Sequence, residues 1–352
     1  MPLQTLDITV ADSSLEDLKK GSLEIVKHLK KNWNPNDIKV KVFTEGATNQ
    51  LIGCFMTPNP DDMVLIRVYG RKTDLFVDRK AEVRNMELMN AAGLGTPVYS
   101  SFNNGLAYKY IPGVIVNKTM VCKPEIYRLI AKTMAQMHAL KTSFDTELNK
   151  PSLFTQMRMF LKLVPSKFAV TEKKARILSE LPSKQELETE VTYLENHLVQ
   201  LGSQIVFCHN DLLGNNIVYN EEKEKVTFID FEYSDNNFQA FDIGNHFCEF
   251  AGLEPYQPEL YPCKEFQKEW IKVYLEEWHY LKGCHCHITE VPPEDVNSLY
   301  VQVNKFALAA HLLWGMWSLV QASHSALDFD YLGYAKCRIG EYYKKKEKFL
   351  AL

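Results

Sequence analysis

The segment that decides the fold reads HNDLLGNNIVY, residues 209–219, and is followed after a short polar stretch by VTFIDFE, residues 226–232. It combines the pattern His-x-Asp-x4-Asn with an apolar run, a turn, and a second apolar run that ends in an aspartate. Short runs rich in β-branched and aromatic residues, separated by turn-forming residues, are typical of paired strands. A tight loop between two such strands is expected to bring Asp211, Asn216 and Asp230 close together.

These three side chains suit the transfer of a phosphoryl group to an alcohol. That reaction requires an oriented hydroxyl, an acceptor for its proton, and cations that bridge the triphosphate. Asp211 can accept the proton, while Asn216 and Asp230 offer oxygens to Mg²⁺, which prefers oxygen ligands. The pattern therefore predicts a kinase-like phosphotransferase. The alternative is that Asp211 caps a loop and Asp230 ends a surface strand, but the second aspartate at this distance favours catalysis.

The composition describes an ordinary soluble globular protein. Of 352 residues, 46% are hydrophobic and 24% are charged, which is ample apolar material for a core. The length predicts about two domains or lobes. With 40 basic and 44 acidic residues the formal net charge is −4, so nucleic acid is not an expected partner.

Cysteine usage and the N-terminal sequence predict a cytoplasmic protein. The eight cysteines are scattered, which favours reduced thiols over a disulfide framework. Residues 1–15 lack the basic-then-apolar order of a signal peptide. The uncharged stretch 306–327 loses its continuous apolar character near Val320, so a buried helix is expected there and no integral membrane segment.

The order of patterns along the chain predicts an α+β protein with two lobes. Residues 1–113 are expected to form a nucleotide-binding lobe, a mostly antiparallel sheet that carries one important helix, and residues 114–352 a mainly helical catalytic and substrate-binding lobe. The expected elements of the first lobe are an amphipathic helix at 12–33, strands near 40–43, 51–56, 63–69, 98–102 and 106–111, a hairpin connection at 57–62 and a helix at about 77–92.

The first lobe also supplies candidate nucleotide-binding residues. The segment 44–49, with Thr48 and Asn49 at its end, lies between two predicted strands, where a loop that covers phosphates would belong; a plain hairpin is the alternative. Arg67 interrupts an apolar strand, and an unpaired buried guanidinium is costly. Its predicted partners are ATP phosphates and Glu82 on the following helix, and a surface arginine is the alternative.

The run IDFEYSDNNFQAFDIGNHFCEF, residues 229–250, resembles the signature of the choline/ethanolamine kinase family. The resemblance extends from about Ile38 to Phe349 and includes the segments 64–70, 314–317 and 329–334. It implies a bilobal protein-kinase-like fold, ATP and Mg²⁺ as cofactors, and transfer of the γ-phosphoryl group to a small amino alcohol.

Carried over by motif, Asp211 resembles the catalytic base of this family, and Asn216 and Asp230 resemble its metal ligands. Arg67 takes the place of the phosphate-binding lysine of protein kinases. His209 is expected to order the loop rather than to transfer protons.

An aromatic wall and acidic residues resemble the amine site of the family. Tyr233, Trp314, Trp317 and Tyr334 would face the cation, because aromatic faces attract cations, and Glu249 would add negative charge. The alternative is that the two tryptophans, three residues apart on an apolar helix, are simply core. Asp242 could also add charge, but we expect it to hold the catalytic loop through backbone N–H groups.

Details of the motifs resemble the ethanolamine branch of the family. Choline kinases typically carry glutamine at the place of Leu213, and the segments 43–51 and 103–106 also match the ethanolamine branch, although Glu45 departs from it. The predicted substrate is thus ethanolamine, with choline kinase or a dual kinase as the alternative. A protein kinase is disfavoured because the region after Asp230 lacks an Ala-Pro-Glu-type segment, and a non-catalytic nucleotide-binding scaffold is the remaining alternative.

Two further features have weaker implications. Cys284, His285, Cys286 and His287 look like a zinc tract, but consecutive residues cannot easily all ligate one tetrahedral ion, so a loop is favoured. The lysines at 344–346 and 348 are expected to form a solvated helix end. The sequence leaves the oligomeric state open, a homodimer included.

Overall fold

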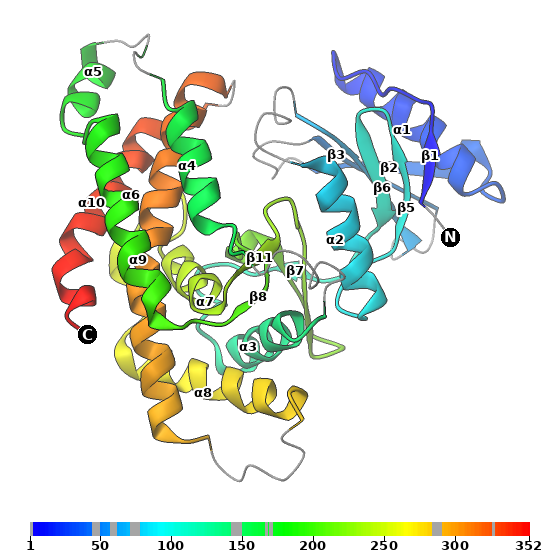
Figure 1. Ribbon diagram of the computed structural model, residues 1–352. Helices are drawn as coiled ribbons and strands as arrows, with labels where there is room; N and C mark the ends of the chain where they lie inside the picture. The colour runs from blue at the N-terminus through cyan, green and yellow to red at the C-terminus, as the bar shows by residue number, and fades with distance from the viewer. Residues whose placement is uncertain are drawn as a thin grey trace. The chain divides into compact units, whose positions relative to one another are not determined.

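The chain forms two compact units in the computed structural model (Figure 1). The first comprises Met1–Val114, Asn220–Lys223 and Thr227–Glu232, and the second comprises Ile115–Tyr219, Glu224–Val226 and Tyr233–Leu352. Asp230 therefore belongs to the first unit although it lies far along the sequence. The structure describes residues 3–43, 50–56, 62–70, 78–141, 150–165, 168, 172–283, 291–325 and 328–352.

A six-stranded sheet is the centre of the first unit, in the order β1-β5-β6-β4-β3-β2. Its neighbours pair antiparallel except β1 and β5, which are parallel. The predicted antiparallel sheet is thus present, with one short parallel strand that the sequence did not reveal. The elements of this unit are β1 (Gln4–Leu6), α1 (Leu15–Leu29), β2 (Ile38–Phe43), β3 (Gln50–Met56), β4 (Val64–Val68), α2 (Arg79–Ala91), β5 (Val98–Phe102) and β6 (Gly105–Lys109).

Strand alternation decides which side chains of the sheet meet α1. Ser14 caps this helix by accepting the N–H of Asp17, and the apolar face of the helix contributes Ile25 to a core shared with Ile52 and Ile66. Because successive side chains of a strand point to opposite faces, Arg67 projects from the other face of β4. A buried charge is therefore placed opposite the hydrophobic core of the sheet.

The second unit is mainly helical. A two-stranded sheet pairs β8 with β11, and a three-stranded sheet has the order β10-β9-β7. The elements are β7 (Val114–Ile115), α3 (Pro124–His138), α4 (Leu153–Leu163), α5 (Glu172–Ser179), α6 (Lys184–Leu198), β8 (Ile205–Cys208), η5 (Gly214–Asn216), β9 (Ile217–Asn220), β10 (Lys225–Phe228), β11 (Asp235–Phe238), α7 (Gln239–Cys248), α8 (Lys264–Leu281), α9 (Pro293–His324) and α10 (Tyr331–Leu350).

The long helix α9 organises this unit, with α7 and α10 packed along it (Figure 1). Its apolar middle, including Phe306 and Met316, is fully buried, as predicted for the uncharged stretch. No helix in the described part of the chain is long and apolar enough to cross a membrane. At Gly244, α7 approaches α9 so closely that a β-carbon would lie 2.6 Å from the carbonyl oxygen of Val303. The packing of α7 therefore depends on the absence of a side chain there.

We predict that Gly244→Ala lowers the free energy of unfolding by about 1–3 kcal/mol, because the added methyl forces the two helix backbones apart. Gly340 on α10 is the matched control, since its β-carbon would meet no atom within 4 Å. Gly340→Ala should stabilise the protein by roughly 0.5–1 kcal/mol, because alanine has the higher helix propensity. Urea unfolding measures both changes, and equal midpoints for the two variants would contradict the packing argument.

Candidate functional site

The loop between β8 and β9 carries Asp211 and Asn216. Asn210, near its start, has a φ of 66°, in the left-handed region that asparagine tolerates better than most residues. The carboxylate of Asp242 on α7 accepts the backbone N–H groups of His209 and Asn210, each at 2.8 Å. Asp242 is fully buried, so it holds the loop from behind, as the sequence predicted.

Asp211 and Asn216 contact each other within this loop. The side-chain amide of Asn216 donates to the backbone oxygen of Asp211 at 2.8 Å and to its carboxylate Oδ2 at 3.3 Å. The N–H of Asp211 donates to Nδ1 of His209 at 3.3 Å, so His209 orders the loop by hydrogen bonding. Two of the side chains predicted to carry the chemistry therefore lie together in the second unit.

The third predicted side chain, Asp230, lies in the first unit and is bonded to Arg67. Its φ is 67°, again in the left-handed region. Arg67 is only 6% exposed and donates from Nη1 to Oδ1 of Asp230 at 3.0 Å and from Nη2 to Oε1 of Glu82. Glu82 is fully buried on α2. The pairing of Arg67 with Glu82 that the sequence suggested is therefore present, and it compensates both buried charges.

Two further charged residues, Arg79 and Glu232, belong to the same cluster and were missed from the sequence. Arg79, the first residue of α2, donates from Nη1 to Oε2 of Glu82 at 3.0 Å and to Oε2 of Glu232 at 3.1 Å. Its guanidinium also lies 4.1 Å from the ring centre of Tyr69. The spacing of Arg79 and Glu82, three residues apart on one helix, was the available signal.

The carboxylates of this cluster form a compact group of oxygen ligands. Burial raises the pKa of Glu232 to about 7; the charge of Asp230 adds to the rise, and two arginines oppose it. Oxygens of Glu82, Asp230 and Glu232 lie within 4.8 Å of one another. Both oxygens of Glu82 bond arginines, whereas Asp230 bonds Arg67 through Oδ1 alone, so Asp230 is the member of this set best able to offer an oxygen to a hard divalent cation such as Mg²⁺.

Three of the four aromatic residues predicted for the amine site lie together in the second unit. The rings of Tyr233 and Trp314 are 5.5 Å apart, and those of Trp314 and Trp317 are 5.7 Å apart. The indole N–H of Trp317 donates to the hydroxyl of Tyr233 at 3.0 Å. Trp314 is buried and donates to Asn245 at 2.8 Å, whereas Trp317 is half-buried, so Trp317 offers the more accessible face.

Tyr334 joins this cluster indirectly. Its ring lies 5.8 Å from that of Phe329, which is 4.8 Å from Tyr331, and Tyr331 lies 5.8 Å from Trp317. A continuous series of rings therefore connects α10 with the tryptophans of α9.

Glu249, predicted to supply negative charge to an amine, already has a cationic partner. Arg338 is fully buried and donates from Nη1 to Oε1 of Glu249 at 2.6 Å and to the hydroxyl of Tyr334 at 2.8 Å. Its Nη2 donates to the backbone oxygen of Ala310 at 3.2 Å. Arg338 therefore compensates much of the negative charge that the sequence assigned to Glu249, and no local pattern pointed to Arg338.

His246 on α7 supports the loop that carries Asp211, and it does so in its neutral form. Its Nδ1 donates to the backbone oxygen of Leu212 at 2.8 Å. Its Nε2 is buried without a hydrogen-bond partner among the described residues. Burial lowers the pKa of His246 to about 4, because a second ring proton would have no acceptor there.

Several predicted features lie outside the described residues: the loop 44–49 with Thr48 and Asn49, residues 57–61 of the hairpin connection, and the tract 284–287.

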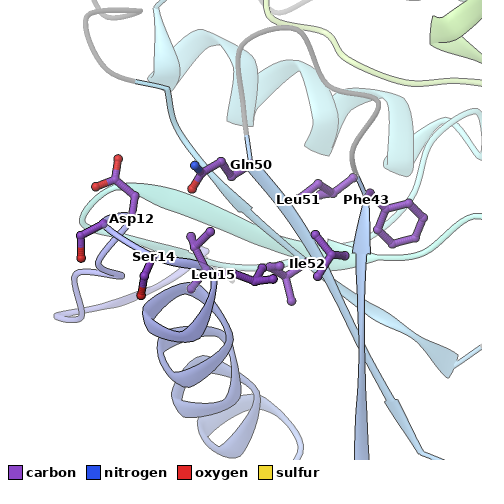
Figure 2. Close-up of a pocket in the computed structure, with 10 residues that line it drawn as sticks. Asp12, Ser14, Leu15, Phe43, Gln50, Leu51 and Ile52 are labelled. Atoms are coloured by element: carbon purple, nitrogen blue, oxygen red, sulfur yellow. The ribbon is translucent and has the colours of Figure 1, made fainter. Parts of the chain in front are cut away.

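A cavity of about 470 Å³ lies between the start of α1 and the ends of β2 and β3 (Figure 2). Its described lining has Asp12 as its one charged residue, which is unsuited to phosphate. None of the predicted site residues that the structure describes lines it.

The chain is similar in sequence to known proteins over nearly its whole length. The family model described as choline/ethanolamine kinase matches residues 40–343. Ethanolamine kinase 1 of Mus musculus is 43% identical over 347 residues, which cover 99% of this chain and 94% of the mouse protein.

Solved structures show the same architecture. The ethanolamine kinase of Plasmodium vivax has a TM-score of 0.81 at 26% identity, covering 95% of this chain and 90% of the other. The choline kinase of Cryptosporidium parvum has a TM-score of 0.77 at 24% identity, covering 95% and 96%. The predicted α+β, protein-kinase-like fold is confirmed.

We predict that acid destabilises the protein through His246. In the unfolded chain the pKa of His246 is near its ordinary value of 6.5, whereas in the folded protein it is about 4. The contribution of neutral His246 to stability is therefore fully present above pH 6.5 and is lost as the pH falls from 6.5 to 4. The loss from this group is about 3 kcal/mol. His246→Asn keeps a donor for Leu212 but cannot be protonated. Its free energy of unfolding, measured in urea at several pH values, should therefore fall less steeply.

Some acid sensitivity should remain in the His246→Asn variant, because burial also places the pKa of His311 well below its ordinary value. An unchanged slope in that variant would contradict the assignment of proton uptake to His246.

We predict that Arg338→Met lowers the free energy of unfolding by about 3–5 kcal/mol, because it leaves the buried carboxylate of Glu249 without its partner. Adding Glu249→Gln should restore part of the loss, since the double variant buries no unpaired charge. Urea unfolding of both single variants and the double variant gives the coupling energy. Additive effects would contradict direct pairing of the two side chains.

Proposed function

The chain belongs to the choline/ethanolamine kinase family, and on that premise we propose that it transfers the γ-phosphoryl group of ATP to the hydroxyl of ethanolamine. The product, phosphoethanolamine, is the first intermediate on the route to phosphatidylethanolamine. The observation that carries the proposal is the loop that Asp242 holds through two backbone N–H groups. In this loop the side-chain amide of Asn216 donates to the carboxylate of Asp211. The similarity to a mouse protein named ethanolamine kinase 1 supports ethanolamine as the acceptor.

In this mechanism Asp211 orients the hydroxyl of the substrate and accepts its proton. Its position is defined by the amide of Asn216 and by the backbone bonds that hold the loop to Asp242. A carboxylate fixed in this way is ready to accept a proton without reorganising, which lowers the barrier.

Asn216 and Asp230 are the proposed protein ligands of Mg²⁺, which, when bound, neutralises charge on the triphosphate. The donor chemistry fits, because amide and carboxylate oxygens suit this cation. Arg67 is proposed to bind phosphate oxygens in the way that a lysine does in protein kinases. Glu82 keeps its guanidinium in place. Thr48 and Asn49 stay predictions for the loop over the phosphates.

Ethanolamine differs from choline in having three N–H donors, each of which needs an acceptor once water is removed. Glu249 bonds Arg338 through Oε1, so its Oε2 can accept from the ammonium of the substrate. Tyr233 and Trp317 are proposed to pack around the carbon chain, with Trp314 and Tyr334 supporting them. The same ring cluster would also suit a quaternary ammonium, so choline is the second candidate acceptor.

Release of ADP by the purified protein with Mg²⁺ and ATP tests the proposal directly. Turnover should depend on ethanolamine and should exceed turnover with choline. Preferential use of choline would keep the mechanism and overturn the assignment to the ethanolamine branch. ATP binding without dependence on either amine would support a scaffold instead. The cytoplasmic location and a homodimeric state stay predictions.

We predict that Asp211→Asn reduces kcat by several powers of ten with little change in thermal stability, because the variant keeps the shape of the loop but loses the proton acceptor. Asp235→Asn is a matched control, since Asp235 is exposed at the start of β11 in the same unit. Steady-state kinetics and thermal unfolding of both variants check the prediction. Near-normal turnover of Asp211→Asn would rule out its role as the base.

A further inference from the structure

The charged cluster of the first unit is ordered as an alternating series. Asp230 bonds Arg67, Arg67 bonds Glu82, Glu82 bonds Arg79, and Arg79 bonds Glu232. The cluster therefore holds three carboxylates and two guanidinium groups. Glu82 uses a different oxygen for each arginine, Oε1 for Arg67 and Oε2 for Arg79.

Because Arg79 pairs with Glu82 and Glu232, Arg67 does not have to compensate all three carboxylates of the cluster. Glu232 lies 3.8 Å from Nη2 of Arg67 but 3.1 Å from Nη1 of Arg79, which is within hydrogen-bond range. Without Arg79, Arg67 would be the one cation among the described residues left to pair with both Glu82 and Glu232. Two nearly buried carboxylates would then compete with Asp230 for one guanidinium, and like charges at this distance repel strongly in a poorly solvated site.

Arg79 is placed for this role by its own surroundings. It is the first residue of α2, and Asp78 caps the helix by accepting the N–H groups of Lys80 and Ala81 at 2.9 and 3.0 Å. The guanidinium also lies 4.1 Å from the ring centre of Tyr69, a cation–π contact that helps to hold it. A planar, multidentate group can bridge two carboxylates while stacked on a ring, which the compact ammonium of lysine cannot reproduce.

We propose that Arg79 is a positioning residue of the nucleotide site, one that holds Glu82 and Glu232 so that Arg67 and the carboxylate of Asp230 keep the arrangement needed for the metal–nucleotide complex. This inference rests on the proposed function. Arg79 acts through Glu82 and Glu232 and is not itself assigned a contact with substrate.

The proposal predicts a specific defect in Arg79→Met. Loss of a residue that orients a metal ligand typically weakens metal affinity by about 10- to 100-fold. The affinity for a non-hydrolysable ATP analogue should therefore fall about tenfold or more in the presence of Mg²⁺. The affinity for the same analogue in EDTA should change much less. Arg79→Lys should show an intermediate loss, because it keeps the charge but not the bridge.

Isothermal titration calorimetry of the wild type, Arg79→Met, Arg79→Lys and Lys80→Met, each with and without Mg²⁺, tests this role. Lys80 is the matched control because it is the next residue on α2 and is exposed. Thermal unfolding of each variant is measured in parallel. If Arg79→Met does not fold, the Arg79→Lys titration decides the question by itself.

A loss confined to the Mg²⁺ complex, with Lys80→Met like the wild type, supports the proposal. Unchanged binding of the Mg²⁺ complex by the Arg79 variants overturns it. Equal losses with and without Mg²⁺ also overturn it, because they indicate a general structural or phosphate-binding effect. Failure of the wild type to bind the Mg²⁺ complex would instead overturn the proposed function, and the role of Arg79 with it.

Discussion

The geometry of the loop that carries Asp211 and Asn216 depends on one buried carboxylate, that of Asp242. It accepts two consecutive backbone N–H groups of the loop and lies 3.0 Å from Nε2 of His138. Burial alone would raise the pKa of Asp242, but the hydrogen bond and charge of His138 and the loop donors outweigh it, so the pKa is lowered. The group therefore stays ionised, and an ionised carboxylate binds backbone N–H groups about twice as strongly as a neutral acceptor does.

The same helix connects the loop to the aromatic cluster. Asn245, one turn after Asp242 on α7, donates from its side-chain amide to the backbone oxygen of Asn210 at 3.1 Å. Its amide oxygen accepts the indole N–H of Trp314 at 2.8 Å. One buried side chain thus fixes the loop and a ring of the proposed amine site at once. The close approach of α7 to α9 at Gly244 is what brings these donors and acceptors within reach.

The sequence revealed what was encoded locally and missed what depends on distant partners. Asp211 and Asn216 are five residues apart, so their spacing alone indicated a shared loop, and Arg67 was conspicuous because a charge interrupted an apolar strand. Arg79 gave only the weak signal of its three-residue spacing from Glu82, because its other partner, Glu232, is 153 residues away in sequence. Arg338 gave none, since its partner Glu249 is 89 residues away. β1 was missed because three residues carry too little pattern to predict a strand.

Both arginines that the sequence missed hold carboxylates in place within largely buried surroundings. Such pairs are weak contributors to stability, because the cost of removing two charges from water offsets most of their attraction. Apolar residues of similar volume would stabilise either unit at least as well. A guanidinium, however, fixes the direction of a carboxylate oxygen through several hydrogen bonds, as Arg338 does with Glu249. The contribution of these arginines is therefore the orientation of polar groups more than folding energy.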